Sequence, residues 1–516
     1  MTVLTLFLLL INVETLFKMK TNKKYFVQKL NPIILLGIIT LLQLTACKKA
    51  DSDTPLNRNI VIYGTLGVEI KASDREKIEE EVVVQSQFLS GSDLNHIQRC
   101  KVELKSNNFS ITIKPQGDFS FVSLASFPSK ILKKGSFFIV PGDSIHIDIQ
   151  DSEKCIINSN NPQLLQCQLD LMEVKNISEY PITENSSAVS RLSDYKDSAF
   201  NRYEEIFSQY EGKVAPEVLN TLKIHYQTQQ NAIFMTKVNS YALFSHNDSL
   251  KYKAKSRIIS DFETLDIISD TLQVRYSINY AEYLLSYIRN YHQLTSPLAN
   301  QEQLFAKIYK NIDKNYQGLL RDKLLTVLSI RYMNSSKASY TYLSRSHASV
   351  KDPDYREILR VIREARTAGK KVFPFALPDV NGKVYTPDDF KGKVVVCKLW
   401  FTGCGGCTYL HKVLKPWKLK YKDNKEVEFI SINVNNKKGQ WEKGLQSGVY
   451  CSPDEINLST FGEGFDHPML KYYNFVGYPQ VLVFDKNGNL ISANPAVGGN
   501  YEVLKSELDK MILENL

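Results

Sequence analysis

Two cysteines separated by two glycines, Cys404-Gly405-Gly406-Cys407, are the residues whose types and spacing most directly imply chemistry. They follow the apolar run 394–400, which predicts a buried strand, and they open a segment with helical patterning. Cysteines at this spacing can form a disulfide across one helical turn. The free N–H groups and the dipole at a helix N-terminus favour a thiolate, which lowers the pKa of the first cysteine. We therefore expect Cys404 to attack a partner disulfide and Cys407 to resolve the mixed disulfide.

The same pair is half of a typical zinc site, so other interpretations exist. No second Cys-x-x-Cys pair occurs in the sequence. The candidates for completing a metal site are His411 and Cys451. Zinc binding and an inert structural disulfide remain as alternatives. The favoured interpretation is a redox site that needs no metal and no cofactor besides the disulfide of Cys404 and Cys407.

The segments around the pair resemble TlpA-like thiol-disulfide oxidoreductases of the thioredoxin superfamily over residues 371–516. The resemblance implies that Pro479 is cis and lies beside the redox pair, where it keeps metals from the thiols. It also implies that the Tyr478 backbone is free to pair with an extended substrate chain, and it matches Trp400 to an aromatic residue of the family. The segments that carry the resemblance are Phe373-Pro-Phe-Ala-Leu-Pro-Asp-Val-Asn-Gly-Lys383, Gly392-Lys-Val-Val-Val396, Leu399-Trp-Phe-Thr-Gly-Cys-Gly-Gly-Cys407 and Gly477-Tyr-Pro-Gln480.

The chain departs from this family pattern next to the cysteines. Gly403 replaces the usual Trp, and the two residues between the cysteines are both Gly. Lys398 stands six residues before Cys404, where thioredoxin has a buried acid. If Lys398 reaches the pair, its charge favours the thiolate and a more oxidising couple; if it points to solvent, it has no effect. Cys397, in the apolar strand, is expected to be an inert core residue.

Alternating strand and helix patterns after residue 371 predict an α/β fold of the thioredoxin type. Besides 394–400, the runs 427–434 and 480–484 read as strands, and 502–516 as an amphipathic helix. The preceding segment 160–370 reads as helical. Its aromatic stripe indicates a helix core, and Asp352 and Pro353 mark the start of its last helix. The stripe consists of Tyr280, Tyr283, Leu284, Tyr287, Ile288 and Tyr291.

Short alternating runs between residues 59 and 155, separated by turn signals such as Pro141-Gly-Asp143, predict a β-sandwich. The patterns Gly117-Asp-Phe-Ser-Phe121 and Val140-Pro-Gly-Asp-Ser-Ile145 resemble a domain of unknown function that precedes many envelope thioredoxin-like proteins. The segment is expected to be a spacer or a partner-binding face.

The composition is that of a globular, multidomain chain. It has 516 residues, of which 43% are hydrophobic and 23% charged, and this excludes a disordered or collagen-like protein. A formal net charge of +9 over this length gives no indication of nucleic-acid binding. Eight cysteines are too few for a disulfide-built scaffold. The pairing of Cys100, Cys155, Cys167 and Cys451 is left open.

The amino terminus reads as a lipoprotein signal over residues 1–46, and Met19 is an alternative start of translation. Basic residues precede the apolar run 33–42, which is shorter than the ~20 residues of a membrane-spanning helix. The run ends in Leu44-Thr-Ala-Cys47, which resembles the lipobox of bacterial lipoproteins. Acylated Cys47 would hold the protein at a membrane outside the cytoplasm through the tether 47–58. An uncleaved anchor helix is the alternative, and the absence of Asp after Cys47 favours the outer membrane over the inner one.

The sequence thus predicts an envelope-anchored, periplasm-facing thiol-disulfide oxidoreductase. Its expected partners are protein thiols and disulfides and an envelope electron donor. Family members include reductases of cytochrome c biogenesis. The first alternative is a peroxiredoxin-like antioxidant, although the Pro-xxx-Thr-xx-Cys loop of peroxiredoxins is missing around Cys404. The second is a non-enzymatic binding scaffold with a vestigial redox domain.

The lipobox generates a direct prediction. Replacing Cys47 with Ser removes the thiol that would be acylated, so the variant should leave the membrane fraction or fail to mature. Fractionation followed by mass measurement of the amino-terminal peptide checks this. Full membrane retention with normal processing would contradict a lipoprotein.

Overall fold

The computed structural model describes residues 59–516 with short gaps. The predicted signal 1–46, Cys47 and the predicted tether 47–58 lie outside the described residues. Among the helices that are described, none is both long enough and apolar enough to cross a bilayer. The gaps fall at 68–69, 71–81, 87–96, 101, 116–118, 182, 266, 269–270, 278, 297–300, 333–337, 436, 476 and 494–500.

The N-terminal β region contains two sheets. In the five-stranded sheet, with strand order β4-β5-β1-β8-β9, β1 pairs antiparallel with β5 and parallel with β8. The other sheet has the order β3-β2-β6-β7. The strands are β1 (Ile60–Leu66), β2 (Val82–Ser86), β3 (Ile97–Cys100), β4 (Glu103–Lys105), β5 (Asn108–Ile113), β6 (Ser120–Ser123), β7 (Phe137–Ile139), β8 (Ser144–Ile149) and β9 (Cys155–Ser159).

Alternation builds the core of this region. In β8 every second residue is buried, and Ile145 and Ile147 lie in one apolar cluster with Ile62 of β1 and Val122 of β6. The last strand, β9, runs beyond the predicted boundary at residue 155. None of its residues is fully buried, which explains why its pattern gave no clear strand signal.

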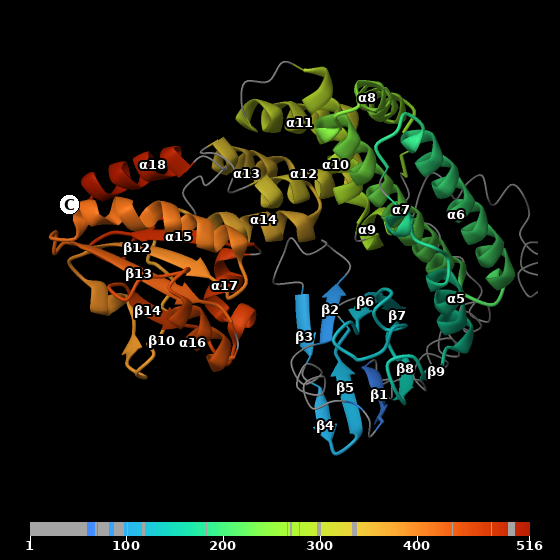
Figure 1. Ribbon diagram of the computed structural model, residues 1–516, viewed down its shortest axis with the longest axis horizontal. Coiled ribbons are helices and arrows are strands. Elements are labelled where there is room, and N and C mark those ends of the chain that lie inside the picture. The colour runs from blue at the N-terminus through green and yellow to red at the C-terminus, as the bar shows by residue number, and fades with distance from the viewer. Residues whose placement is uncertain are drawn as a thin grey trace, which may run out of the picture. The chain divides into compact units, whose positions relative to one another are not determined.

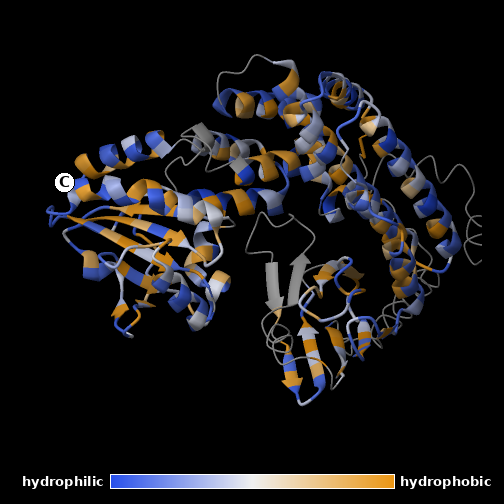
Figure 2. Cartoon of the chain, viewed as in Figure 1, coloured by the Kyte–Doolittle hydropathy of each residue, from blue (hydrophilic) through white to orange (hydrophobic). Residues whose placement is uncertain are grey.

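The central region is helical, as predicted. Its helices carry hydrophobic and hydrophilic stripes (Figure 2), as expected for helices that bury one face. They are α5 (Pro162–Met172), η2 (Ile177–Glu179), α6 (Ala188–Tyr210), α7 (Pro216–Phe244), α8 (Asp248–Glu263), α9 (Thr271–Tyr276), α10 (Tyr280–Thr295), α11 (Gln301–Asn315), α12 (Gly318–Tyr332), α13 (Ala338–Ser349) and α14 (Pro353–Ala365).

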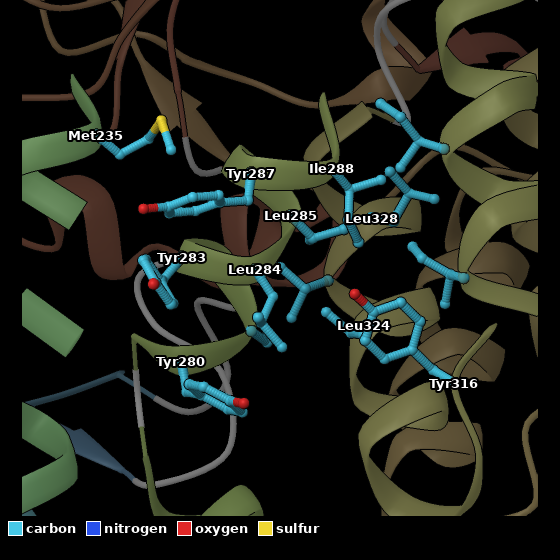
Figure 3. Close-up of a cluster of buried hydrophobic side chains, with 14 of the residues drawn as sticks. Met235, Tyr280, Tyr283, Leu284, Leu285, Tyr287, Ile288, Tyr316, Leu324 and Leu328 are labelled. Atoms are coloured by element: carbon cyan, nitrogen blue, oxygen red, sulfur yellow. The ribbon is translucent and has the colours of Figure 1, made fainter. Parts of the chain in front are cut away.

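The aromatic stripe lies on α10, and all of its members except the half-buried Tyr291 belong to the core. Tyr283, Leu284 and Tyr287 project from α10 toward neighbouring helices, where Met235 and Leu324 are drawn beside them (Figure 3). The predicted start of α14 is also confirmed, because the Asp352 side chain accepts hydrogen bonds from the N–H groups of residues 354 and 355.

The C-terminal domain is built on a five-stranded sheet of order β14-β13-β12-β15-β16. The first three strands in this order are parallel, and β15 and β16 are antiparallel to their neighbours. The elements are β10 (Leu377–Pro378), β11 (Val384–Tyr385), η3 (Pro387–Phe390), β12 (Val394–Trp400), α15 (Gly405–Lys418), η4 (Leu419–Tyr421), β13 (Val427–Asn433), α16 (Lys438–Ser447), β14 (Ile456–Ser459), η5 (Gly464–Asp466), α17 (Pro468–Tyr473), β15 (Gln480–Phe484), β16 (Leu490–Ala493) and α18 (Tyr501–Leu513).

The central strand β12 is buried on both faces, as its run of apolar residues, interrupted only by Lys398, predicts. Val394 and Val396 pack in one cluster with residues of α15 and α18, whereas Val395 and Leu399 pack in another with residues of α17. Helices α15 and α18 accordingly lie on one side of the sheet, and α17 on the other (Figure 1). This alternation decides which residues of β12 face the helix that carries the cysteines.

Candidate functional site

The two cysteines form a disulfide at the start of α15. Cys404 is the N-cap residue, and its Sγ accepts a hydrogen bond of 3.1 Å from the N–H of Cys407. The Cα atoms of the pair are 5.2 Å apart, and both residues are nearly buried, with exposures of 5% for Cys404 and 3% for Cys407. The sulfur of Cys404 therefore sits where the helix dipole and a backbone donor favour negative charge.

The loop before Cys404 is held by an aromatic pair. Trp400 stacks on Tyr450, with ring centroids 4.7 Å apart and planes at 7°. The Tyr450 hydroxyl accepts a 2.8 Å hydrogen bond from the N–H of Gly403. Gly403 has φ of +100°, which an L-residue with a side chain rarely adopts. This conformation accounts for Gly at a position where the family usually has Trp.

Pro479 lies next to the redox turn, as the resemblance implied. The Tyr478–Pro479 peptide bond is cis. A Cβ atom added to Gly406 would lie 3.1 Å from Cδ of Pro479 and 3.7 Å from the Tyr478 carbonyl oxygen. The glycine between the cysteines thus lets the turn approach Pro479 closely. The Tyr478 ring packs edge-on against Phe401, which immediately follows β12.

Lys398 does not point to solvent. It belongs to the face of β12 that carries Val396 and Trp400, the face turned toward α15, and it is 7% exposed. Its Nζ lies 2.8 Å from Oε2 of Glu455 and 2.9 Å from Nδ1 of His411. The alternative in which Lys398 points to solvent is therefore wrong. The charge of Lys398 is compensated by the carboxylate of Glu455.

Glu455 connects this lysine to a second one. Its Oε1 accepts a 3.0 Å bond from Nζ of Lys418, which also lies 2.9 Å from the exposed Asp454 carboxylate. Burial alone would raise the pKa of Glu455, but Lys398 and Lys418 bring that pKa below its ordinary value. Burial lowers the pKa of Lys398, and Glu455 offsets this in part. Lys398, Glu455 and Lys418 thus form a buried ion cluster in which one carboxylate pairs with two ammonium groups.

His411 lies on α15 in contact with this cluster. Burial, and next the charge of Lys398, lower the pKa of His411 to about 4, so its ring is neutral at physiological pH. Its Nδ1 is engaged by Lys398. Across the described part of the chain, no group of three or more His, Cys, Asp or Glu side chains is arranged to hold a metal.

The remaining described cysteines are free thiols. Cys397 is fully buried and packs on the face of β12 away from α15, and burial raises its pKa. Cys451 packs in the same buried cluster as Cys404 and Cys407, and burial raises its pKa to about 11. Neither environment favours a thiolate.

Sequence reasoning missed Glu455 and Tyr450 altogether, and it considered His411 only as a zinc ligand. Glu455 follows the surface residues Pro453 and Asp454, so nothing local marks it as buried. The available signal was Lys398 itself, because a lysine in an apolar strand requires a buried partner.

Comparison with known proteins gives a consistent assignment for this domain. A family model described as thioredoxin-like matches residues 392–490. The chain is 27% identical over 130 residues to the thiol-disulfide oxidoreductase ResA of Bacillus thuringiensis subsp. konkukian, covering 25% of this chain and 69% of ResA. The same figures hold for ResA of Bacillus cereus.

Solved structures match the same part of the chain. The thioredoxin domain of a thiol-disulfide oxidoreductase from Bacteroides vulgatus is 20% identical, with 28% of this chain and 98% of that chain covered and a TM-score of 0.25. A thiol-disulfide oxidoreductase from Bacteroides fragilis is 18% identical, with 28% and 99% covered and a TM-score of 0.25. Together with the sheet and helix order above, the family match identifies the C-terminal domain as thioredoxin-like.

The buried ion cluster predicts a large cost for removing its acid. Glu455→Gln leaves Lys398 and Lys418 without their shared carboxylate, which should cost about 3–5 kcal/mol at neutral pH. All three tryptophans, Trp400, Trp417 and Trp441, lie in this domain, so denaturant unfolding followed by tryptophan fluorescence reports its stability. The pKa of Glu455 is lowered in the folded state, so its stabilisation is present above about pH 4.3 and is lost as pH falls further.

The matched control is Glu428→Gln, because Glu428 pairs with Lys393 at 2.6 Å on a partly exposed surface. That change should cost less than about 1 kcal/mol. The difference between wild type and Glu455→Gln should also shrink below about pH 4. A cost for Glu455→Gln no larger than that of the control would contradict a stabilising role for the cluster.

The contact between Gly406 and Pro479 gives a second prediction. Gly406→Ala should destabilise the domain by about 1–3 kcal/mol, because the new methyl group must displace Pro479. Gly405→Ala is the matched control, since no atom lies within 4 Å of a Cβ added there. The control should be neutral or gain up to about 1 kcal/mol from helix propensity. Equal unfolding midpoints for the two variants would show that the approach is not tight.

Proposed function

We propose that the protein is a thiol-disulfide oxidoreductase that exchanges disulfides with protein substrates through Cys404 and Cys407. The thioredoxin-like domain and its oxidoreductase relatives support oxidoreductase activity. The observation that carries the assignment of roles is the N-cap position of Cys404, whose Sγ accepts a hydrogen bond from the helix backbone. An attacking sulfur needs thiolate character, and this position supplies it.

The exchange proceeds in two displacements that need no cofactor. The Cys404 thiolate attacks a substrate disulfide, forming a mixed disulfide and releasing one substrate sulfur as a thiolate. Cys407 then loses its proton and attacks Sγ of Cys404, which forms the intramolecular disulfide and releases the second substrate sulfur. The substrate gains two electrons and two protons, and the Cys404–Cys407 pair is oxidised by the same amount. An external dithiol must then reduce the pair, which is the role of the electron donor in this proposal.

The surroundings of the pair suit an extended protein substrate. Pro479 and the Tyr478 carbonyl lie beside Gly406 at the redox turn. We assign these two residues to substrate positioning, and Trp400 to support of the loop through its stack on Tyr450. Lys398 supports the site from below through its ion pair with Glu455.

The cellular setting is part of the same proposal. The signal-like segment and the lipobox-like sequence ending at Cys47 support a lipid-anchored protein facing the periplasm, with the outer membrane favoured. In this proposal the β region is a sandwich. In the sequence, the β region and the helical region lie between the anchor and the redox domain. Residues of both sheets contribute to one apolar cluster, which supports a sandwich. A role in cytochrome c biogenesis is one setting in which such a reductase would act.

Cysteine variants test the assignment. Cys404→Ser should abolish reduction of insulin disulfides, because the attacking sulfur is lost. Cys407→Ser should still attack but retain the substrate as a mixed disulfide that mass spectrometry can identify. Cys155→Ser removes a free thiol of the β region and should leave the rate unchanged. Full insulin reduction by Cys404→Ser would refute the proposed role, and consumption of peroxide without insulin reduction would favour a peroxidase.

A further inference from the structure

The inner face of α15 links the second cysteine to the buried ion cluster. Cys407, His411 and Lys418 are all buried residues of this helix, at spacings that place them on one side. On the facing strand, Trp400 packs in the cluster that contains both cysteines, and Lys398 lies two residues earlier on the same face of β12. His411 therefore lies one turn below the redox pair, between it and the charges.

The two ring nitrogens of His411 have different roles. Nζ of Lys398 lies 2.9 Å from Nδ1. An ammonium group can only donate, so Nδ1 accepts and the ring hydrogen is carried by Nε2. His411 is only 4% exposed, and its Nε2 has no hydrogen-bond partner among the described residues. A buried donor without an acceptor is costly, so such a group calls for an explanation.

Helix geometry makes Cys407 a neighbour of the His411 side chain. Side chains of an α-helix lean toward its N-terminus, over the residues three and four positions earlier. For His411 that turn contains Cys407. In the oxidised protein the Cys407 sulfur is bound to Cys404 and carries no charge, so it is a poor acceptor. In the reduced protein the same sulfur can become a thiolate, which is a strong acceptor.

We propose that the Nε2–H group of His411 donates a hydrogen bond to the Cys407 thiolate, and that Lys398 and Glu455 are positioning residues that fix the imidazole for this purpose. The inference rests on the proposed redox function and deepens it, because it explains how a buried resolving cysteine becomes reactive. In the mixed disulfide, the Cys407 proton passes to water and from there to the substrate thiolate that has already been released, and the His411 donor stabilises the remaining Cys407 thiolate. The thiolate then attacks Sγ of Cys404, and the substrate sulfur leaves with the electron pair of the broken bond.

The charges around His411 fit a neutral donor. Lys398 faces it from β12, Lys415 and Lys418 lie on its own helix, and Glu455 faces it from the segment before β14. Burial, and next the three cations, disfavour a second proton on the ring and lower its pKa, and Glu455 opposes this only in part. The donor consequently keeps one tautomer while the nearby sulfur changes its charge.

The test measures the acidity of Cys407 directly, without reference to turnover. In the full chain carrying Cys404→Ser, the rate at which iodoacetamide alkylates Cys407 is followed against pH by peptide mapping. His411→Leu has a similar volume and no donor, and it should raise the apparent pKa of Cys407 by about one unit, a tenfold lower thiolate fraction. His411→Gln can place an amide N–H near the position of Nε2 and should retain most of the wild-type acidity.

Two further variants separate this role from packing and from general electrostatics. His411→Asn can accept from Lys398 but is too short to place a donor at the Nε2 position, so it should behave like His411→Leu. Lys415→Met removes an exposed cation of the same helix and should leave the Cys407 pKa nearly unchanged. Tryptophan fluorescence identifies any variant that has not folded, and the Asn and Gln pair remains decisive if Leu is not tolerated.

An unchanged Cys407 pKa in folded His411→Leu or His411→Asn would overturn the inference. Equal shifts in the Asn and Gln variants would also overturn it, because only packing would then be involved. Failure of the proposed redox function is a separate result. If the role proposed for Cys404 is wrong, insulin reduction will persist in Cys404→Ser, whatever the acidity of Cys407.

Discussion

The start of α15 is the constraint on which the site depends. A sulfur at the N-cap must lie within hydrogen-bonding reach of the backbone N–H groups of the first turn, and Cys404 does so. This requires a sharp bend between β12 and the helix, which the positive φ of Gly403 provides. The Tyr450 hydroxyl fixes the bend, and the Trp400 ring fixes Tyr450. The sheet thus positions Cys404 through a short series of direct contacts.

Beneath this turn the domain contains a charged group that an apolar core would ordinarily exclude. Lys398, Glu455 and Lys418 are buried together, and none of them would be stable there alone. The cluster fixes the imidazole of His411 in one tautomer. In the proposed mechanism, stability and redox chemistry are therefore coupled in this domain, since the same ion pairs that compensate burial also hold the imidazole that would donate to Cys407.

Several elements of the fold were predictable from local patterns. The runs 394–400 and 480–484 coincide with β12 and β15, because strands that are buried on both faces consist largely of apolar residues. The N-cap Asp352 was readable for a similar reason, since capping depends on adjacent residues. Strand β9 was not, because it lies at the sheet edge and buries none of its side chains fully.

The partners of Lys398 could not be predicted from the residues near it in the sequence. Glu455 is 57 residues away in sequence and reaches Lys398 through the chain reversal before β14. His411 was visible in the sequence, but its role depends on which face of α15 meets β12. Side-chain pairing across a sheet and a helix is a property of tertiary packing, and a single sequence contains no periodic signal for it.

The relative acidity of the two thiols tests the central claim most directly. In the reduced wild-type protein, alkylation of Cys404 and Cys407 is followed by peptide mapping as a function of pH. We predict that Cys404 reacts first, with an apparent pKa below the ~8.5 of a free cysteine and within the range of about 3.5–7.5 found for cysteines at helix N-termini. Faster alkylation of Cys407 at neutral pH, or an apparent pKa of Cys404 at or above that of a free cysteine, would contradict the account.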